Sequence, residues 1–185
     1  MNRGDTLLRI ARATIEHAFG GPAVEKPDGA PFLDEKRAVL VTLRKHGELR
    51  GCVGQLAPRM TLFEAVQDAA RAAAFRDTRF TPLGEGELAA LHIEISVLSV
   101  LQRLDVHGEQ ETVDALRVGV DGVVLSAGSR RAVFTPEMWK ELPDPREFRW
   151  HLRRKGGLPL DRWPEDMSVQ RFTAELYEEP APAVA

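Results

Sequence analysis

Two apolar, β-branched segments joined by a tight turn limit the folds open to this chain more than any other feature. Residues 38–44 and 49–56 each have the composition of a strand, and Lys45-His46-Gly47-Glu48 supplies a turn between them. This pattern predicts a β-hairpin, and therefore an antiparallel sheet on which helices must pack.

Helical periodicity predicts a first helix over residues 6–18, capped by Asp5. A second helix is expected over residues 62–75, where Thr61 and Glu64 form a capping-box pair. Its six alanines indicate close packing on a sheet. Further helical segments are predicted at residues 85–90, 113–116, 136–142 and 145–155.

The remaining strands complete an α+β pattern. They are predicted at residues 91–100, 131–134 and 168–178, with a further hairpin over 117–126 that turns at Asp121-Gly122. Hairpins mixed with irregularly placed helices favour an α+β fold with a mainly antiparallel sheet flanked by helices. We expect a single domain over residues 5–178 and a disordered tail over residues 179–185.

Composition argues against several classes of protein. The net charge of −3 over 185 residues disfavours a protein that coats nucleic acid, which needs a basic surplus to displace counterions. The one cysteine, Cys52, rules out an intrachain disulfide. No window approaches the roughly 18 apolar residues of a membrane span, and no apolar signal segment follows Met1. We therefore expect a cytoplasmic protein that does not enter a membrane.

The segment Leu49-Arg50-Gly51-Cys52-Val53-Gly54 is the strongest candidate for a functional site. Glycines weaken a strand, so Gly51 and Gly54 indicate a bulge, a close helix–strand contact or a backbone approached by a ligand. Strand alternation places Arg50, Cys52 and Gly54 on one face, where the guanidinium would favour a reactive thiolate. The alternative is a buried and inert cysteine, because free cysteine is among the most often buried residue types.

His92 and Glu94 share one face of the strand predicted over residues 91–100. If this strand neighbours the cysteine strand with matching faces, Cys52, His92 and Glu94 would supply a nucleophile, a base and an orienting carboxylate. The alternatives are a surface histidine, and a glutamate that is solvated or paired with Arg50, Arg76 or Arg79.

The loop Arg76-Asp77-Thr78-Arg79-Phe80 is a second candidate. Two arginines three residues apart beside an aromatic ring can grip a carboxylate or phosphate through fork-shaped hydrogen bonds. Asp77 can equally pair with its neighbours and hold the loop closed. The predicted ligand-binding residues are Arg50, Gly51, Gly54, Arg76, Asp77 and Arg79.

The helix predicted over residues 145–155 carries a stripe of arginines: Arg146, Arg149 and Arg153. The stripe can contact RNA, although a solvated helix face fits the acidic composition better. We expect the three tryptophans to pack in the core and not to stack on bases: Trp139, Trp150 and Trp163.

Motifs for nucleotide binding, a nucleophilic serine or a metal are absent from the sequence. It has no Gly-x-Gly-x-x-Gly turn, no phosphate loop and no Gly-x-Ser-x-Gly elbow. The five histidines lack metal-ligand spacing, and a lone cysteine cannot build a zinc or iron–sulfur site. We predict no cofactor and no intrinsic metal.

Six blocks together resemble a known family. They begin with the hexapeptide at residues 49–54 and Ala73-Ala74-Phe75-Arg76-Asp77-Thr78-Arg79-Phe80. The others are Ile93-Glu94-Ile95-Ser96-Val97-Leu98, Gly119-Val120-Asp121-Gly122-Val123, Phe134-Thr135-Pro136-Glu137-Met138-Trp139 and Arg154-Lys155-Gly156-Gly157-Leu158. Their order and their span, about residues 5–178, resemble the AMMECR domain family, also called AmmeMemoRadiSam system protein A.

The resemblance implies an α+β protein with a larger and a smaller lobe and with the hexapeptide near a cleft between them. It also implies a bacterial or archaeal protein that works with a Memo-like protein and a radical SAM protein. It brings no established reaction. Members often have cysteine where this chain has Arg153, and that departure argues against chemistry requiring two thiols.

The leading hypothesis is a cytoplasmic accessory or small-ligand-binding protein that works with these two partners. A small anionic ligand would suit the arginines of the two candidate segments, and a homodimer is compatible with the sequence. The second hypothesis is an enzyme that uses Cys52 as its nucleophile. The third is an RNA-associated module that uses the arginine stripe.

Overall fold

The computed structural model describes residues 2–180. The described residues form two compact units, the first built from residues 2–98 and 175–180, the second from Ser99–Ala174. Each unit contains its own four-stranded sheet and hydrophobic core, so the expected α+β class with antiparallel pairing is confirmed. Across residues 2–180, no helix is long and apolar enough to cross a membrane.

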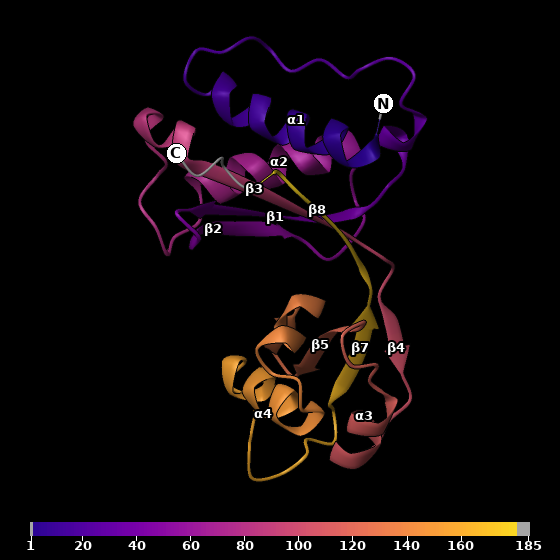
Figure 1. Ribbon diagram of the computed structural model, residues 1–185. Helices are drawn as coiled ribbons and strands as arrows, with labels where there is room; N and C mark the ends of the chain where they lie inside the picture. Colours follow the sequence, from indigo (N-terminus) through magenta and orange to yellow (C-terminus); the bar gives the residue numbers. More distant parts are fainter. Residues whose placement is uncertain (1, 181–185) are drawn as a thin grey trace. The chain divides into compact units, whose positions relative to one another are not determined.

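The first unit is a sheet with both of its α-helices on one face (Figure 1). Its strands lie in the order β2-β1-β3-β8: β1 (Ala38–Lys45), β2 (Glu48–Gln55), β3 (Leu91–Leu98) and β8 (Ala174–Glu178). The helices are α1 (Arg3–His17) and α2 (Leu62–Phe75), with short 3-10 turns η1 (Pro31–Asp34) and η2 (Glu85–Ala90). Val41, Leu43 and Ile93 are fully buried in this core.

Local capping chemistry sets the ends of both helices. The predicted capping box begins α2, since Thr61 N donates to Glu64 Oε2 at 3.0 Å and the Thr61 hydroxyl accepts from Glu64 N. The predicted start of the first helix was wrong. Asn2 caps α1 by accepting from Gly4 N at 3.1 Å, and Asp5 lies within the first turn.

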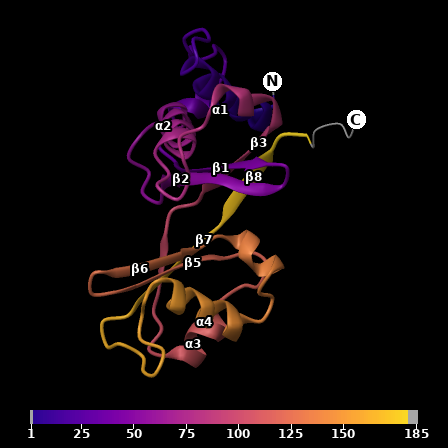
Figure 2. The ribbon, with the colours of Figure 1, turned by 90° about the vertical axis from the view of Figure 1, so that its left-hand side faces the viewer.

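The second unit has a sheet in the order β4-β7-β5-β6, with its two α-helices on the same side of it (Figure 2). Its elements are β4 (Gln102–Leu104), α3 (Glu109–Ala115), β5 (Gly122–Ala127), β6 (Arg130–Phe134), η3 (Pro136–Lys140), α4 (Pro145–Lys155) and β7 (Ser168–Phe172). Trp139 stacks on Phe148 with ring centroids 3.7 Å apart, and both are buried. The expected core position of Trp139 is confirmed, but Trp150 is 39% exposed.

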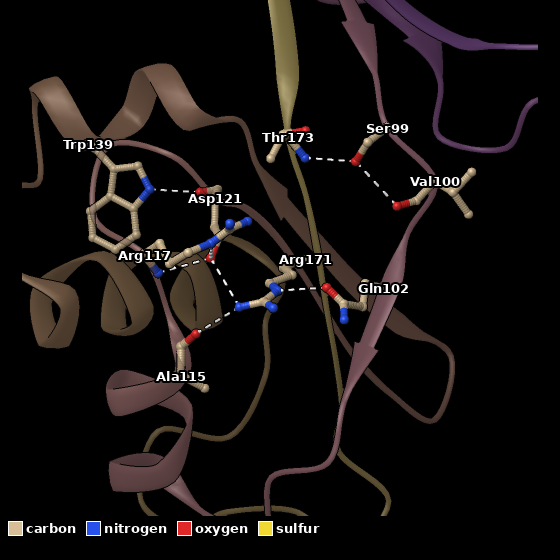
Figure 3. A network of polar contacts seen from close by, with 9 residues as sticks. All are labelled: Ser99, Val100, Gln102, Ala115, Arg117, Asp121, Trp139, Arg171 and Thr173. Carbon is tan, nitrogen blue, oxygen red and sulfur yellow. Dashed lines mark hydrogen bonds and ion pairs between the residues drawn. The ribbon is translucent and has the colours of Figure 1, made fainter.

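The predicted hairpin over residues 117–126 was wrong, because a buried carboxylate ties its first half into a turn. Asp121 is fully buried and accepts from Arg117 N at 2.9 Å and from the Arg117 guanidinium at 2.6 Å (Figure 3). Arg171 faces the same carboxylate, and Trp139 Nε1 donates to the Asp121 carbonyl at 2.7 Å. The hairpin therefore forms between β5 and β6, around Gly128.

The single strand predicted over residues 168–178 is divided between the two sheets as β7 and β8. Between them, Thr173 N donates to Ser99 Oγ and Thr173 O accepts from Ser99 N, each at 2.9 Å. Glu179, the first residue of the predicted tail, is bound: its carboxylate accepts from Arg12 at 2.6 Å and from Ile93 N at 2.9 Å. The rest of that predicted tail, beyond Pro180, lies outside the described residues.

Candidate functional site

Cys52 lies on β2, at the edge of the first sheet, in a row of polar side chains that crosses the strands. Thr42 on β1 is its cross-strand partner, and Thr42 is paired in turn with Glu94 on β3. The Thr42 hydroxyl donates to Cys52 Sγ at 3.3 Å. All three side chains are half-buried. Because alternate residues of a strand face opposite sides, this row lies opposite Val41, Leu43 and Ile93 and away from the helices.

The loop after α2 docks onto the free edge of β2 at Cys52. Asp77 Oδ2 accepts from Cys52 N at 2.9 Å, and Arg79 Nη2 donates to Cys52 O at 3.2 Å. Arg79 also clasps Asp77 through Nε at 3.0 Å and Nη2 at 2.7 Å. The loop thus satisfies the outward backbone groups of an edge strand as a neighbouring strand would.

Electrostatics fix Asp77 in its charged form. The Arg79 guanidinium and the Cys52 amide hold the pKa of the Asp77 carboxyl well below its usual range. Arg76, the other arginine of the loop, donates to Asp68 at 2.6 Å. Of the two interpretations of this loop, the closed one describes the observed contacts, since Arg76 and Arg79 already hold carboxylates.

Arg50 does not share the face of Cys52 as strand alternation predicted. The pairing passes from Leu43 with Gly51 to Arg44 with Leu49, so Arg50 is the extra residue of a β-bulge. Its guanidinium donates to both oxygens of Glu87, at 3.1 and 2.9 Å. With support from Gly84 N and Lys45, it holds the pKa of Glu87 well below its usual range.

The two glycines mark close backbone contacts. A Cβ at Gly51 would overlap the carbonyl oxygen of Ala73 in α2, so this glycine lets the helix approach the sheet. A Cβ at Gly54 would overlap the backbone of Val39 and Leu40 in the paired strand β1. The bulge and the close helix–strand contact expected from the glycines are therefore both present in the hexapeptide.

The structure brings His92 and Glu94 to the same sheet face as Cys52 but does not join them to it. Two strand spacings separate Cys52 from Glu94, roughly 9–10 Å. Glu94 pairs with Arg44 and not with one of the three arginines expected, since Arg44 Nε donates to Glu94 Oε1 at 2.5 Å. His92 lies opposite Arg44 in the register. Among the described residues, Cys52 forms hydrogen bonds only with Thr42, Asp77 and Arg79.

Sequence reasoning missed three residues that shape this region: Thr42, Arg44 and Glu87. Thr42 and Arg44 sit two apart on β1, directly between the candidate residues of β2 and β3. Their alternation with Val41 and Leu43 was a usable signal, because it assigns them to the face opposite the core. Glu87 gave no such signal, since it belongs to a 3-10 turn and reaches Arg50 from 37 residues away.

The arginine stripe on α4 is not a solvated face. Arg153 is 1% exposed, and its guanidinium contacts Glu109 and the carbonyls of Pro159 and Arg162. Arg149 also binds Glu109, at 2.5 Å. The interpretation of the stripe as one exposed surface was therefore wrong, because two of its three arginines are turned toward α3 and the loop after α4.

Known proteins match this chain over nearly its whole length. Residues 8–177 match the model of the AMMECR1 family. A protein of Thermococcus onnurineus is 39% identical over 97% of this chain and 91% of its own length. For a protein of Methanocaldococcus jannaschii, the identity is 33% over 98% of this chain and 92% of its own.

A solved structure has the same fold. The crystal structure of the uncharacterised protein PH0010 from Pyrococcus horikoshii has a TM-score of 0.87 with this chain and 35% sequence identity. The similarity covers 98% of this chain and 94% of that protein. At this identity and coverage the two chains share the arrangement of both units' elements, and the α+β class inferred from the sequence is confirmed.

Proposed function

Because the chain belongs to the AMMECR1 family, we propose that it is a cytoplasmic accessory protein that binds a small ligand and works with a Memo-like protein and a radical SAM protein. The ligand would meet the sheet face that carries Cys52, Thr42, Arg44, His92 and Glu94. We call this surface the polar face. It offers a thiol, a hydroxyl, a guanidinium, an imidazole and a carboxylate, and so both donors and acceptors.

One observation carries the proposal: the backbone of Cys52 is fixed from outside the sheet while its side chain faces the polar row. Asp77 and Arg79 bind the amide and the carbonyl of Cys52 along the strand edge. The sulfur accepts from Thr42 on β1. A binding group must be held by surrounding residues if it is to meet a ligand in a defined geometry, and this arrangement does that for the thiol.

The arginines of residues 49–54 and of the loop at residues 76–80 are already paired with carboxylates of the protein itself. Arg50 holds Glu87, Arg76 holds Asp68 and Arg79 holds Asp77. A small anionic ligand would have to compete with these carboxylates at the loop. On the polar face it would instead meet Arg44, whose side chain is 40% exposed and bonds one oxygen of Glu94.

A thermal-shift screen against a broad metabolite collection tests ligand binding. The wild-type chain should show a saturable rise in Tm with at least one compound. Thr42→Val keeps the shape but removes the hydroxyl at Cys52 Sγ, and should abolish that response. Thr78→Val, an exposed threonine in the loop, is the matched control and should retain it. No response from the wild type, or an equal response from Thr42→Val, contradicts the proposal.

Co-purification tests the accessory role. When the chain is co-expressed with the Memo-like and radical SAM proteins of its own host, we expect at least one of them to be retained with it. Retention of neither partner, in the presence and in the absence of a ligand found by the screen, removes this part of the proposal.

A second candidate, an enzyme with Cys52 as nucleophile, is favoured by the hydroxyl that donates to the sulfur. This hydrogen bond would hold the sulfur in a defined position for attack on an electrophile bound at the polar face. If this holds, iodoacetamide should alkylate the wild type faster than Thr42→Val at pH 7. Equal rates in two correctly folded proteins would remove this candidate.

A further inference from the structure

Three side chains that can ligate a metal meet on the polar face, at the border between β3 and β8. His92 and Glu94 project from β3, and Glu178 projects from the neighbouring strand β8. One ligand atom from each residue lies within 4.8 Å of the others. We infer that His92, Glu94 and Glu178 form a binding site for a divalent transition-metal ion.

The spacing suits a metal after a small adjustment. Zinc-type ions hold nitrogen and oxygen ligands at about 2.0–2.2 Å, which places neighbouring ligand atoms roughly 3–3.5 Å apart. The three ligand atoms lie within 4.8 Å of one another, so side-chain rotations are enough to reach this range. Glu178 is exposed and has the most freedom to turn, while β3, which carries His92 and Glu94, is an inner strand of the sheet.

Arg44 orients one of the proposed metal ligands without being a ligand itself. It donates to Oε1 of Glu94 at 2.5 Å and so fixes the orientation of the carboxylate, whose second oxygen is available to a metal. Its charge also offsets one of the two carboxylates. The cluster with Arg44 then has a net charge of about −1 with neutral imidazole, which a divalent cation overcompensates. We therefore expect a weaker site than two uncompensated carboxylates would give.

The ligand set selects the metal class. Carboxylates alone suit Mg²⁺ and Ca²⁺, but an imidazole ligand shifts the preference toward Mn²⁺, Fe²⁺, Co²⁺ and Zn²⁺. Three protein ligands leave coordination positions for water or for an anionic group of a ligand. The inference deepens the proposed function and rests on the polar face being the binding surface.

No sequence pattern predicts this site. His92 and Glu94 lie two residues apart on a strand, which is not a helical metal-ligand spacing, and Glu178 comes from the other end of the chain. Only the pairing of β8 with β3 brings the third ligand into reach. The expectation of no intrinsic metal rested on the spacing of histidines and cysteines, and such spacing does not reveal a carboxylate supplied by a distant strand.

Calorimetric titration of the chelator-treated, untagged full-length chain with CoCl₂ tests the inference, with MgCl₂ in parallel. We expect one Co²⁺ per chain and no saturable heat with Mg²⁺. His92→Gln and Glu178→Gln should each weaken Co²⁺ binding at least about tenfold, since loss of a mere outer-shell partner already costs about 10–100-fold. The visible spectrum of bound Co²⁺ should lack thiolate charge-transfer absorption.

Two controls separate the site from general charge effects. Glu175→Gln makes the same change on the same strand, at a residue held by Arg37 and Tyr177 outside the cluster. His107→Gln removes an exposed imidazole in the second unit. Both should bind Co²⁺ within about twofold of the wild type, well inside the tenfold loss expected of a true ligand.

The inference is overturned by the absence of saturable Co²⁺ binding, by a loss below tenfold in either ligand variant, or by a thiolate spectrum. The proposed function is tested separately, by running its metabolite screen both with and without chelator. A metabolite response in the screen together with no saturable Co²⁺ binding in the titration would exclude the metal site and leave the proposed function standing.

Discussion

Replacing Asp77 with alanine should release the strand that carries Cys52. The carboxylate accepts from Cys52 N at 2.9 Å and from Arg79 at 2.7 Å, and only 6% of the Asp77 side chain is exposed. A hydrogen bond to a charged group contributes about 1.5–3 kcal/mol. The pair with Arg79, whose side chain is 54% exposed, adds at most about 1 kcal/mol. We expect Asp77→Ala to lower the free energy of unfolding by about 2–3 kcal/mol.

Asp68→Ala is the matched control, because Asp68 pairs with the other arginine of the same loop. The Asp68–Arg76 pair is 2.6 Å long, but its side chains are 40% and 58% exposed. Solvent screening limits such a pair to about 1 kcal/mol or less. Both variants remove a carboxylate, from positions about two helical turns and the start of a loop apart. They differ in the burial of that carboxylate and in the backbone amide that Asp77 alone holds.

Urea denaturation followed by two probes measures the effect. All three tryptophans lie between residues 99 and 174, so their fluorescence follows the second unit, whereas far-UV circular dichroism follows both. The circular dichroism midpoint of Asp77→Ala should fall clearly below that of Asp68→Ala. If the two variants agree within about 0.5 kcal/mol, the docked loop does not stabilise the strand and the reasoning fails.

Three further variants test other contacts. Gly51→Ala, whose Cβ would overlap a helix carbonyl, should cost about 1–3 kcal/mol in urea denaturation, whereas Gly86→Ala, with open space around it, should stay within about 0.5 kcal/mol. The depressed pKa of Asp77 means that the wild type exceeds Asp77→Asn in free energy of unfolding by its full margin above about pH 4, and by less as pH falls further. An equal difference in free energy of unfolding between the two proteins at pH 7 and at pH 2 would contradict this. Arg153→Met, which strips the partner from two carbonyls and Glu109, should cost about 2–3 kcal/mol by tryptophan fluorescence, against less than about 0.5 for the exposed Arg146→Met.

Two of the helices that begin at a local cap were predicted to the residue. Residues 62–75 and 145–155 form α2 and α4 as expected, because Thr61 with Glu64 and Asp144 with Pro145 determine the helix starts. Elements decided by distant partners were not. The strand over residues 168–178 is divided because Ser99, from far along the chain, takes both backbone groups of Thr173.

In the candidate site, too, features set by local sequence were predicted and features set by distant segments were not. Alternation correctly placed His92 and Glu94 on one face of β3, and the glycines signalled close backbone contacts. It failed at Arg50, because a bulge is a property of two paired strands and not of either strand alone. The contact between Asp77 and Cys52 was equally hidden, since nothing in either segment specifies that the loop lies along the edge of β2.

The residues around Cys52 by which this family is recognised therefore hold the strand of Cys52 in place and do not themselves form the proposed binding surface. Gly51 admits α2, Arg50 holds Glu87, and Asp77 with Arg79 closes the edge at Cys52. These contacts use the groups that a motif search would assign to a ligand. The groups on the polar face come from strands whose sequence is far less distinctive: Thr42, His92, Glu94 and Glu178. If this division is right, substitutions in the first set chiefly lower stability and affect binding only through the position of Cys52. Conservative substitutions in the second set weaken binding and leave stability close to that of the wild type.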